Sequence, residues 1–307
     1  MKLKIKNSFI PWSFLDIVAK DQGIFADHGL EIEFFTVNRD ELEPADKVAW
    51  YSDLVKAHKL DAYSVCAWGA IDRLAGNDRE KIIAASTSSA YAFSIVADAR
   101  NGIKGIEDLA GVPIAVNMRT GSHYCIVSEL EKSLPYEKVK VIHGGEPAKR
   151  LRGLIEGRFK AVALISPYTE IAVSLGYRSV AETKTVDVLA FVARKDMPQE
   201  VMASYLKSLD VAARRVESDK ESYRPIYVKT LKETFDGYPD DIRQRVFIEI
   251  NKIYNEIPIT VWSRLSEYPK ESFESLKMWM KKHNLVDSPV EYDQVVYVEP
   301  LTRIVNS

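Results

Sequence analysis

The sequence has little cysteine, no long apolar run and no excess of basic charge. Its 307 residues include two cysteines, Cys66 and Cys125, which form no spacing typical of a zinc or redox site. Two thiols are the simpler interpretation, with a disulfide as the alternative. No segment approaches the ~18 apolar residues that a membrane-spanning helix needs. The formal net charge of −2 provides no basic surface for nucleic acid or an anionic membrane.

The sequence also lacks a glycine-rich phosphate loop, a His/Cys metal cluster and a nucleophile elbow. We therefore predict no cofactor and no metal. Hydrophobic residues make up 46% of the chain and charged residues 28%, as in ordinary globular proteins. A chain of this length suffices for one large or two medium domains.

The N-terminal segment 1–10 alternates charged and apolar residues with a period of two. This pattern predicts a strand, because a signal peptide has a basic region followed by an uninterrupted apolar core. As the sequence stands, the pattern favours a cytoplasmic protein. If a signal peptide was removed upstream, a periplasmic or extracellular location is expected instead.

Strand and helix patterns alternate along most of the chain, which is typical of an α/β fold. The predicted strands are 2–8, 31–37, 62–66, 81–85, 93–97, 113–117, 139–143, 161–165 and 186–193. The predicted helices are 15–25, 48–58, 67–75, 121–134, 147–156 and one ending at 176, and the chain is helical from 199 onward. We expect lobe 1 to comprise 1–97 plus 191–307, with lobe 2 (98–190) inserted. Two crossings, near 97–101 and 185–193, would form a hinge.

Three stretches resemble the type 2 periplasmic binding proteins. The stretch Val18-Ala-Lys-Asp-Gln-Gly-Ile-Phe-Ala-Asp-His-Gly-Leu-Glu-Ile-Glu33 is similar to the opening motif "AKDKGFFKKEGLDVE" of that family. Residues 103–116 resemble the entry into its second lobe, "I.s..DLkGK.IAv". Thr120-Gly-Ser-His123 is similar to "GTGSH" in the binding proteins for sulfonates, nitrate, taurine and thiamine-pyrimidine precursors (SsuA/ThiY-like).

The resemblance implies a two-lobed Venus-flytrap fold with the ligand in a cleft between the lobes. The family also includes cytoplasmic enzymes on the same scaffold. The sequence departs from the family in a long charged segment, 36–61, and in lacking the Cys-rich signature of the pyrimidine synthases. Ser8-Phe-Ile-Pro-Trp12 stands where the biphenyl sulfinate desulfinase carries its cysteine. Neither of those two activities carries over.

In such a fold the ligand is expected at strand ends and helix N-termini, where backbone N–H groups favour negative charge. Three loops of the first lobe therefore supply candidates. Trp12 offers a flat apolar wall with an N–H donor and lies beside Ser13, although a core tryptophan is the alternative. Cys66 is either a reactive thiol or a small buried hydrophobe, and Trp68 follows it. Ser88 and Ser89 end a hydroxyl-rich run that suits an anion or an ordinary turn.

The loop that opens the predicted helix at 121 is the strongest candidate in the second lobe. Arg119 has the geometry for a bidentate pair with a carboxylate or sulfonate, and a surface arginine is the alternative. Thr120 and Ser122 supply hydroxyls, and Gly121 lets the backbone approach a ligand. His123 is either a general acid or base or a solvent-facing residue.

Tyr168, after the 161–165 strand, would add a hydroxyl donor to the second lobe. The favoured function is binding of a small organic anion (sulfonate, carboxylate or pyrimidine-like) as the substrate-binding protein of an ABC importer, whose permease would be its partner if the protein is exported. The alternative is a cofactor-independent cytoplasmic lyase or decarboxylase acting on an aromatic or carboxylated molecule. In that case Cys66 and His123 are the candidate catalytic residues.

Overall fold

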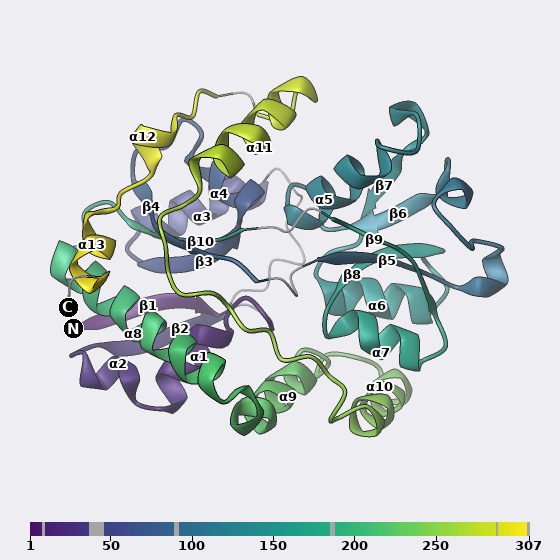
Figure 1. Ribbon diagram of the computed structural model, residues 1–307, viewed down its shortest axis with the longest axis horizontal. Helices are drawn as coiled ribbons and strands as arrows, with labels where there is room; N and C mark the ends of the chain where they lie inside the picture. The colour runs from purple at the N-terminus through teal and green to yellow at the C-terminus, as the bar shows by residue number, and fades with distance from the viewer. Residues whose placement is uncertain (8–9, 37–45, 89–91, 185–187, 287, 306–307) are drawn as a thin grey trace. The chain divides into compact units, whose positions relative to one another are not determined.

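The computed structural model describes residues 1–7, 10–36, 46–88, 92–184, 188–286 and 288–305. The chain divides into two compact units, each built around a five-stranded sheet (Figure 1). Unit 1 comprises Met1–Ser88, Val188–Tyr223 and Val261–Ser307, and unit 2 comprises Ser89–Asp187 and Arg224–Thr260. No helix within the described residues is long and apolar enough to cross a membrane. Cys66 and Cys125 are both buried thiols, as expected.

The sheet of unit 1 has the strand order β2-β1-β3-β10-β4. Its strands are β1 (Lys2–Asn7), β2 (Glu31–Thr36), β3 (Ala62–Cys66), β4 (Glu80–Ser86) and β10 (Leu189–Arg194). Strand β1 is parallel to β2 and β3, and β10 runs antiparallel between β3 and β4. Every residue of β3 is buried, as is almost every residue of β4 and β10, because helices cover both faces of the sheet.

Eight helices of unit 1 fall within the described residues. They are α1 (Phe14–Asp21), α2 (Ile24–Asp27), α3 (Asp46–Lys56), α4 (Ala67–Leu74), α8 (Gln199–Ser218), α11 (Lys270–Lys282), α12 (Tyr292–Val295) and α13 (Glu299–Val305). The long helix α8 packs against α1, α2 and α13, and α11 packs against α4. The helix predicted at 15–25 is divided in two, because Gly23 takes a left-handed φ of 69° between α1 and α2.

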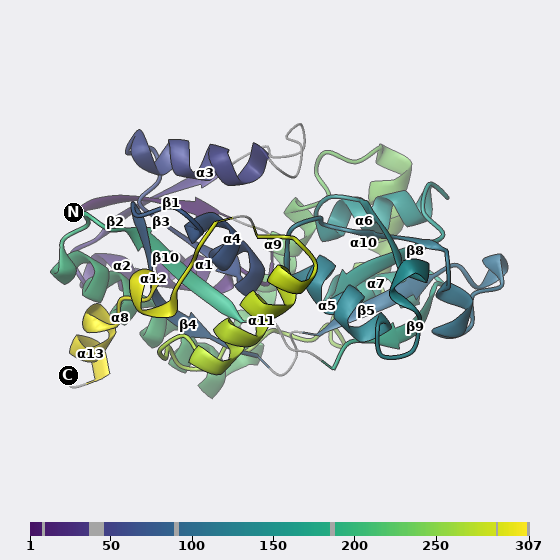
Figure 2. The same cartoon turned by 90° about the horizontal axis from the view of Figure 1, so that it is seen from above.

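The charged segment 36–61 contributes helix α3, which packs against α4 and lies on the side of the sheet away from α8 and α13 (Figure 2). Tyr51 of α3 is fully buried. Its ring lies 5.1 Å from the ring of Tyr63, and the Arg73 guanidinium stacks 3.7 Å from its centroid. The second half of the segment is therefore part of the unit 1 core. Residues 37–45 lie outside the described residues.

The sheet of unit 2 has the order β7-β6-β8-β5-β9. Its strands are β5 (Phe93–Ala97), β6 (Pro113–Val116), β7 (Lys140–His143), β8 (Ala161–Ile165) and β9 (Arg178–Glu182). Its helices are α5 (Gly121–Leu130), α6 (Pro147–Ile155), α7 (Tyr168–Ser174), α9 (Arg224–Glu233) and α10 (Asp240–Lys252). Strands β6, β7 and β8 are parallel, and β5 runs antiparallel to β8 and β9.

The predicted lobe boundaries are corrected in two places. Residues 93–97 form β5, which pairs with β8 and β9 and so belongs to unit 2. Residues 224–260 also belong to unit 2, because α10 and the turn after α9 pack on α7: the Phe235 ring lies 6.0 Å from the Tyr168 ring. The chain therefore passes between the units four times instead of twice. Local patterning marks 224–260 as helical but does not show to which unit these helices belong.

A buried carboxyl joins α1 to α8 in unit 1. Asp16 is 1% exposed, and its Oδ1 accepts a hydrogen bond of 2.8 Å from the Tyr205 hydroxyl. Oδ2 is buried and accepts no hydrogen bond within the described part of the chain. Burial raises the pKa of Asp16 to about 7, because the ionised form loses its hydration, and hydrogen bonds from the Tyr205 hydroxyl and the main chain only partly offset this loss.

Removing the Tyr51 side chain should destabilise unit 1. We expect Tyr51→Ala to lower the free energy of unfolding by about 3–5 kcal/mol, since the ring is fully buried between Tyr63 and Arg73. Urea denaturation followed by circular dichroism measures the effect. Tyr136→Ala, at a tyrosine that is 53% exposed, is the control and should change little. Equal stability of Tyr51→Ala and the wild type would show that α3 is not part of the core.

Replacing Asp16 should change how stability depends on pH. The folded protein holds the Asp16 proton up to about pH 7, whereas an unfolded chain releases it near the ordinary value of 3.8. The wild type therefore loses stability as pH rises between these values. We expect Asp16→Asn to be more stable than the wild type at pH 8, by about 1–3 kcal/mol, with a smaller difference at pH 5. Thermal unfolding at both pH values tests this, with exposed Asp21→Asn as control; a difference independent of pH would contradict it.

Candidate functional site

Three helices of unit 2 begin at one edge of its sheet. Strands β6, β7 and β8 are parallel, so their carboxyl ends share this edge, and α5, α6 and α7 start from it (Figure 1). The first-turn N–H groups of a helix have no partner within the helix, and its dipole is positive at that end. Anions are commonly bound at such positions.

The loop between β6 and α5 is held by its own hydroxyl groups. The Ser122 hydroxyl accepts a hydrogen bond of 3.0 Å from the Asn117 N–H. The Thr120 hydroxyl donates to the Asn117 carbonyl at 2.7 Å and lies 3.1 Å from the Ser122 hydroxyl. Ser122 is 2% exposed. Both hydroxyls predicted to bind a ligand therefore also fix the loop that starts α5.

Two histidines hold the next part of this loop. The Met118 N–H donates to His143 Nδ1 at 3.2 Å, and the Arg119 N–H donates to His123 Nδ1 at 3.4 Å. Since Nδ1 is the acceptor in both rings, each neutral imidazole carries its proton on Nε2. The sequence analysis missed His143 and Asn117, although both lie directly at the ends of predicted strands.

Arg119 itself is half-buried and has a φ of 57°, in the left-handed region that non-glycine residues seldom adopt. A strained backbone at the start of a helix is maintained by its surroundings, here by the contacts of 117–123. The arrangement fixes the position from which the Arg119 side chain leaves the main chain.

The corresponding edge of unit 1 collects the other candidate loops. Cys66 and Ser86 both pair with Leu189, so the ends of β3 and β4 lie on either side of the start of β10. Cys66 is 6% exposed, and its Sγ accepts a hydrogen bond of 3.4 Å from the Gly69 N–H. The thiol thus caps α4 in the way that a serine or aspartate usually does.

Side-chain hydrogen bonds hold the main chain of the loop after β1. The Trp262 indole donates to the Pro11 carbonyl at 3.1 Å, and the Ser64 hydroxyl donates to the Trp12 carbonyl at 3.4 Å. Trp12 is 8% exposed, and Ser13 is fully buried. The backbone of the Trp12 turn is therefore held by residues of two other segments of unit 1.

The segment around Ser263, which was predicted to be helical, lies beside the end of β4 in extended form. The Ser263 N–H donates to the Thr87 carbonyl at 2.8 Å, and the Ser263 hydroxyl accepts from the Thr87 N–H at 3.0 Å. The Ser86 hydroxyl donates to the Ser263 carbonyl at 2.8 Å. Ser263 was missed as a site residue; Pro258 and Pro269 on either side were the signal that the helix is interrupted.

The structure brings the predicted residues together in two groups. Trp12, Ser13, Cys66, Trp68 and Ser88 belong to unit 1, and Arg119, Thr120, Gly121, Ser122, His123 and Tyr168 belong to unit 2. Ser89 lies outside the described residues. Cys66 belongs to unit 1 and His123 to unit 2, so their pairing as catalytic residues stays a prediction.

Two predicted ligand contacts occupy core positions. Trp68 is fully buried, and its ring packs edge-on against Trp279 at 5.5 Å. Tyr168 is also fully buried, with its hydroxyl 3.4 Å from that of Thr234. Burial raises the pKa of the Tyr168 hydroxyl well above its usual value, so it acts as a hydrogen-bond donor and not as an acid. Within the described residues, no group of three or more His, Cys, Asp or Glu side chains is placed to hold a metal.

No family model matches the chain, and no curated protein matches its sequence. Solved structures do match. The alkanesulfonate-binding protein SsuA of Xanthomonas axonopodis pv. citri, bound to MOPS, superposes with a TM-score of 0.72 at 14% identity, over 97% of this chain and 98% of its own. A Candida albicans protein with the generic periplasmic binding protein fold gives 0.66 at 13% identity, over 97% and 96%. The desulfurization enzyme DSZB gives 0.63 at 13% identity, over 99% of both chains.

These likenesses show that the chain has the type 2 periplasmic-binding-protein fold predicted from its sequence. The fold hosts both a sulfonate-binding protein and an enzyme among these neighbours. Function must therefore be argued from the residues at the strand ends.

Removing the Ser122 hydroxyl should loosen the start of α5. We expect Ser122→Ala to cost about 1–3 kcal/mol of stability, because the buried Asn117 N–H loses its acceptor. Ser128→Ala is the matched control, since Ser128 lies in the same helix and its hydroxyl, among the residues described, donates only to the carbonyl of Cys125. Urea unfolding curves compare the two variants. Equal stabilities would show that the Ser122 hydroxyl does not hold the loop.

Proposed function

We propose that the protein binds a small organic anion, a sulfonate or a carboxylate, as the substrate-binding component of an ABC importer. The observation that carries the proposal is the edge of unit 2 where α5, α6 and α7 begin, with Arg119 in the loop before α5. Backbone N–H groups and a guanidinium together suit a group with several acceptor oxygens.

A buried cation supports this choice of ligand charge. Arg150 of α6 is 1% exposed and donates to the carbonyls of Ala163, at 2.6 Å, and Gly145, at 2.5 Å. Gly145 lies in the turn between β7 and α6, so the guanidinium is fixed close behind the same edge of the sheet. Its positive charge adds to the potential of the three helix N-termini.

Unit 1 would contribute contacts of a different kind. Trp12 offers an apolar surface with an N–H donor, and Ser88 offers a hydroxyl after β4. We leave Trp68 and Tyr168 out of the proposed contacts because both are fully buried in the cores of their units.

The likeness to an alkanesulfonate-binding protein supports the importer role. In such a system a separate membrane permease would carry out transport. A receptor of this kind would work outside the cytoplasmic membrane.

The enzymatic alternative is less well supported by the candidate catalytic groups. The Cys66 thiol is largely buried and is engaged in capping α4. His123 Nδ1 already accepts the Arg119 N–H, which leaves Nε2–H as a donor and no basic nitrogen for proton abstraction.

Ligand binding should depend on the Arg119 charge. We expect short alkanesulfonates or carboxylates to raise the unfolding temperature, and Arg119→Asn to weaken binding about tenfold or more, because charge-assisted hydrogen bonds are lost. Asparagine tolerates the left-handed backbone at this position, so the loop should be retained. Isothermal titration calorimetry measures the affinities.

Arg158→Ala is the matched control, since Arg158 is an exposed arginine of unit 2 that pairs with Glu156. Mass spectrometry of the ligand after incubation separates the two functions. A ligand recovered unchanged supports the receptor, and conversion to a new mass would establish an enzyme. Undiminished binding by Arg119→Asn would exclude the proposed contact.

A further inference from the structure

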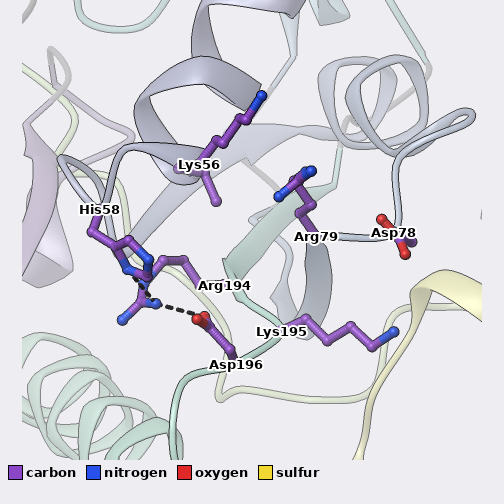
Figure 3. Close-up of a pocket in the computed structure, with 8 residues that line it drawn as sticks. Lys56, His58, Asp78, Arg79, Arg194, Lys195 and Asp196 are labelled. Carbon is purple, nitrogen blue, oxygen red and sulfur yellow. Dashed lines mark hydrogen bonds and ion pairs between the residues drawn. The ribbon is translucent and has the colours of Figure 1, made fainter.

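Unit 1 has a second polar surface at the opposite edge of its sheet. A pocket of about 510 Å³ lies where β10 ends and β4 begins, away from Cys66 and Ser86 (Figure 3). Its lining residues are Val55, Lys56, His58, Asp78, Arg79, Arg194, Lys195 and Asp196. We call it the Arg194 pocket. Four of its side chains are cationic and two are carboxylates.

Arg194 is held rigidly by its neighbours. Its Nε donates to Asp61 at 2.9 Å and its Nη1 to Asp196 at 2.5 Å, and Nη1 also lies 2.8 Å from His58 Nδ1. Figure 3 shows the guanidinium between His58 and Asp196. The single positive charge of Arg194 is therefore shared by the carboxylates of Asp61 and Asp196, and Arg194 forms a fixed corner of the pocket.

Two other cationic residues, Arg79 and Lys195, lie on neighbouring strand ends. The pairing of Glu80 with Arg194 places Arg79 opposite Lys195, and the Lys195 N–H donates to the Arg79 carbonyl at 2.8 Å. Like charges on neighbouring strands repel. The backbone pairing thus places two positively charged residues next to each other at the pocket wall, and their side chains leave it in different directions (Figure 3).

Other charges nearby increase this excess. Lys56, Arg79 and Lys195 form no ion pair with any residue that the structure describes. Lys81 lies two residues after Arg79. Its pKa is lowered first by burial and then by the positive charge of Lys195. Asp78 is the one lining carboxylate not already paired with Arg194 among the described residues. A positive excess therefore remains in the pocket.

We propose that the Arg194 pocket binds a compact anion with two or more negative charges, such as a phosphorylated or polycarboxylate small molecule. The volume lies within the range of small-ligand sites. Such an anion would be attracted by the positive charges of Lys56, Arg79 and Lys195 and would accept hydrogen bonds from those of them that reach it. The site is independent of the proposed importer ligand, since none of its residues lies in the strand-end loops described above.

The test uses inorganic pyrophosphate and citrate as probes, with sodium chloride at matched ionic strength. Calorimetry should detect binding of at least one probe to the wild type, and the double variant Arg79→Gln/Lys195→Gln should bind it about tenfold more weakly or worse. The same variant should unfold at an equal or higher temperature than the wild type in low salt without anion, because a repulsive pair has been removed. Binding of only one probe would support the site and assign its chemistry.

Two control variants make the result specific. Lys220→Gln changes a charge elsewhere in unit 1 and should leave binding unchanged. Arg119→Asn should also leave it unchanged, whereas loss of binding there would assign the anion to the α5 loop and overturn the proposal. Equal stabilisation by chloride, or undiminished binding by the double variant, would overturn it as well.

Discussion

Strand β10 runs antiparallel between β3 and β4, and most of unit 1 depends on this pairing. Leu189 lies opposite both Cys66 and Ser86, which joins residues more than a hundred positions apart in the chain. At its other end, Arg194 lies opposite Glu80 and bonds Asp61. One strand thus helps to position two regions of unit 1. The loops that we propose for ligand binding lie at one end of β10, and the Arg194 pocket lies at the other.

In unit 2 the main constraint is the start of α5. Ser122, Thr120, His123 and His143 all bond the main chain of a loop of four residues, and they hold Arg119 at a left-handed φ. The hydroxyl and imidazole groups that could bind a ligand thus already hold the main chain of the loop. Such a loop is organised before binding, so little ordering would be needed when an anion arrives.

The two proposed sites differ in how the protein places positive charge. At the α5 edge the charge comes largely from backbone N–H groups and the buried Arg150, which are fixed by the fold. In the Arg194 pocket it comes from side chains on exposed strand ends, held together by the pairing of β4 with β10. The first arrangement suits a specific small anion, and the second suits a highly charged, well-hydrated anion.

The sequence by itself determined the fold class and most strands and helices, because alternating burial and helical periodicity are local properties. It also identified the 119–123 loop, since residues that start a helix after a strand are recognisable from their types. It did not show that residues 224–260 belong to unit 2, that Ser263 lies beside Thr87, or that Trp68 and Tyr168 are core residues. Only the tertiary structure decided these points, because they depend on which distant segment packs on each element, and a period of 3.6 or 2 describes a face without naming its partner.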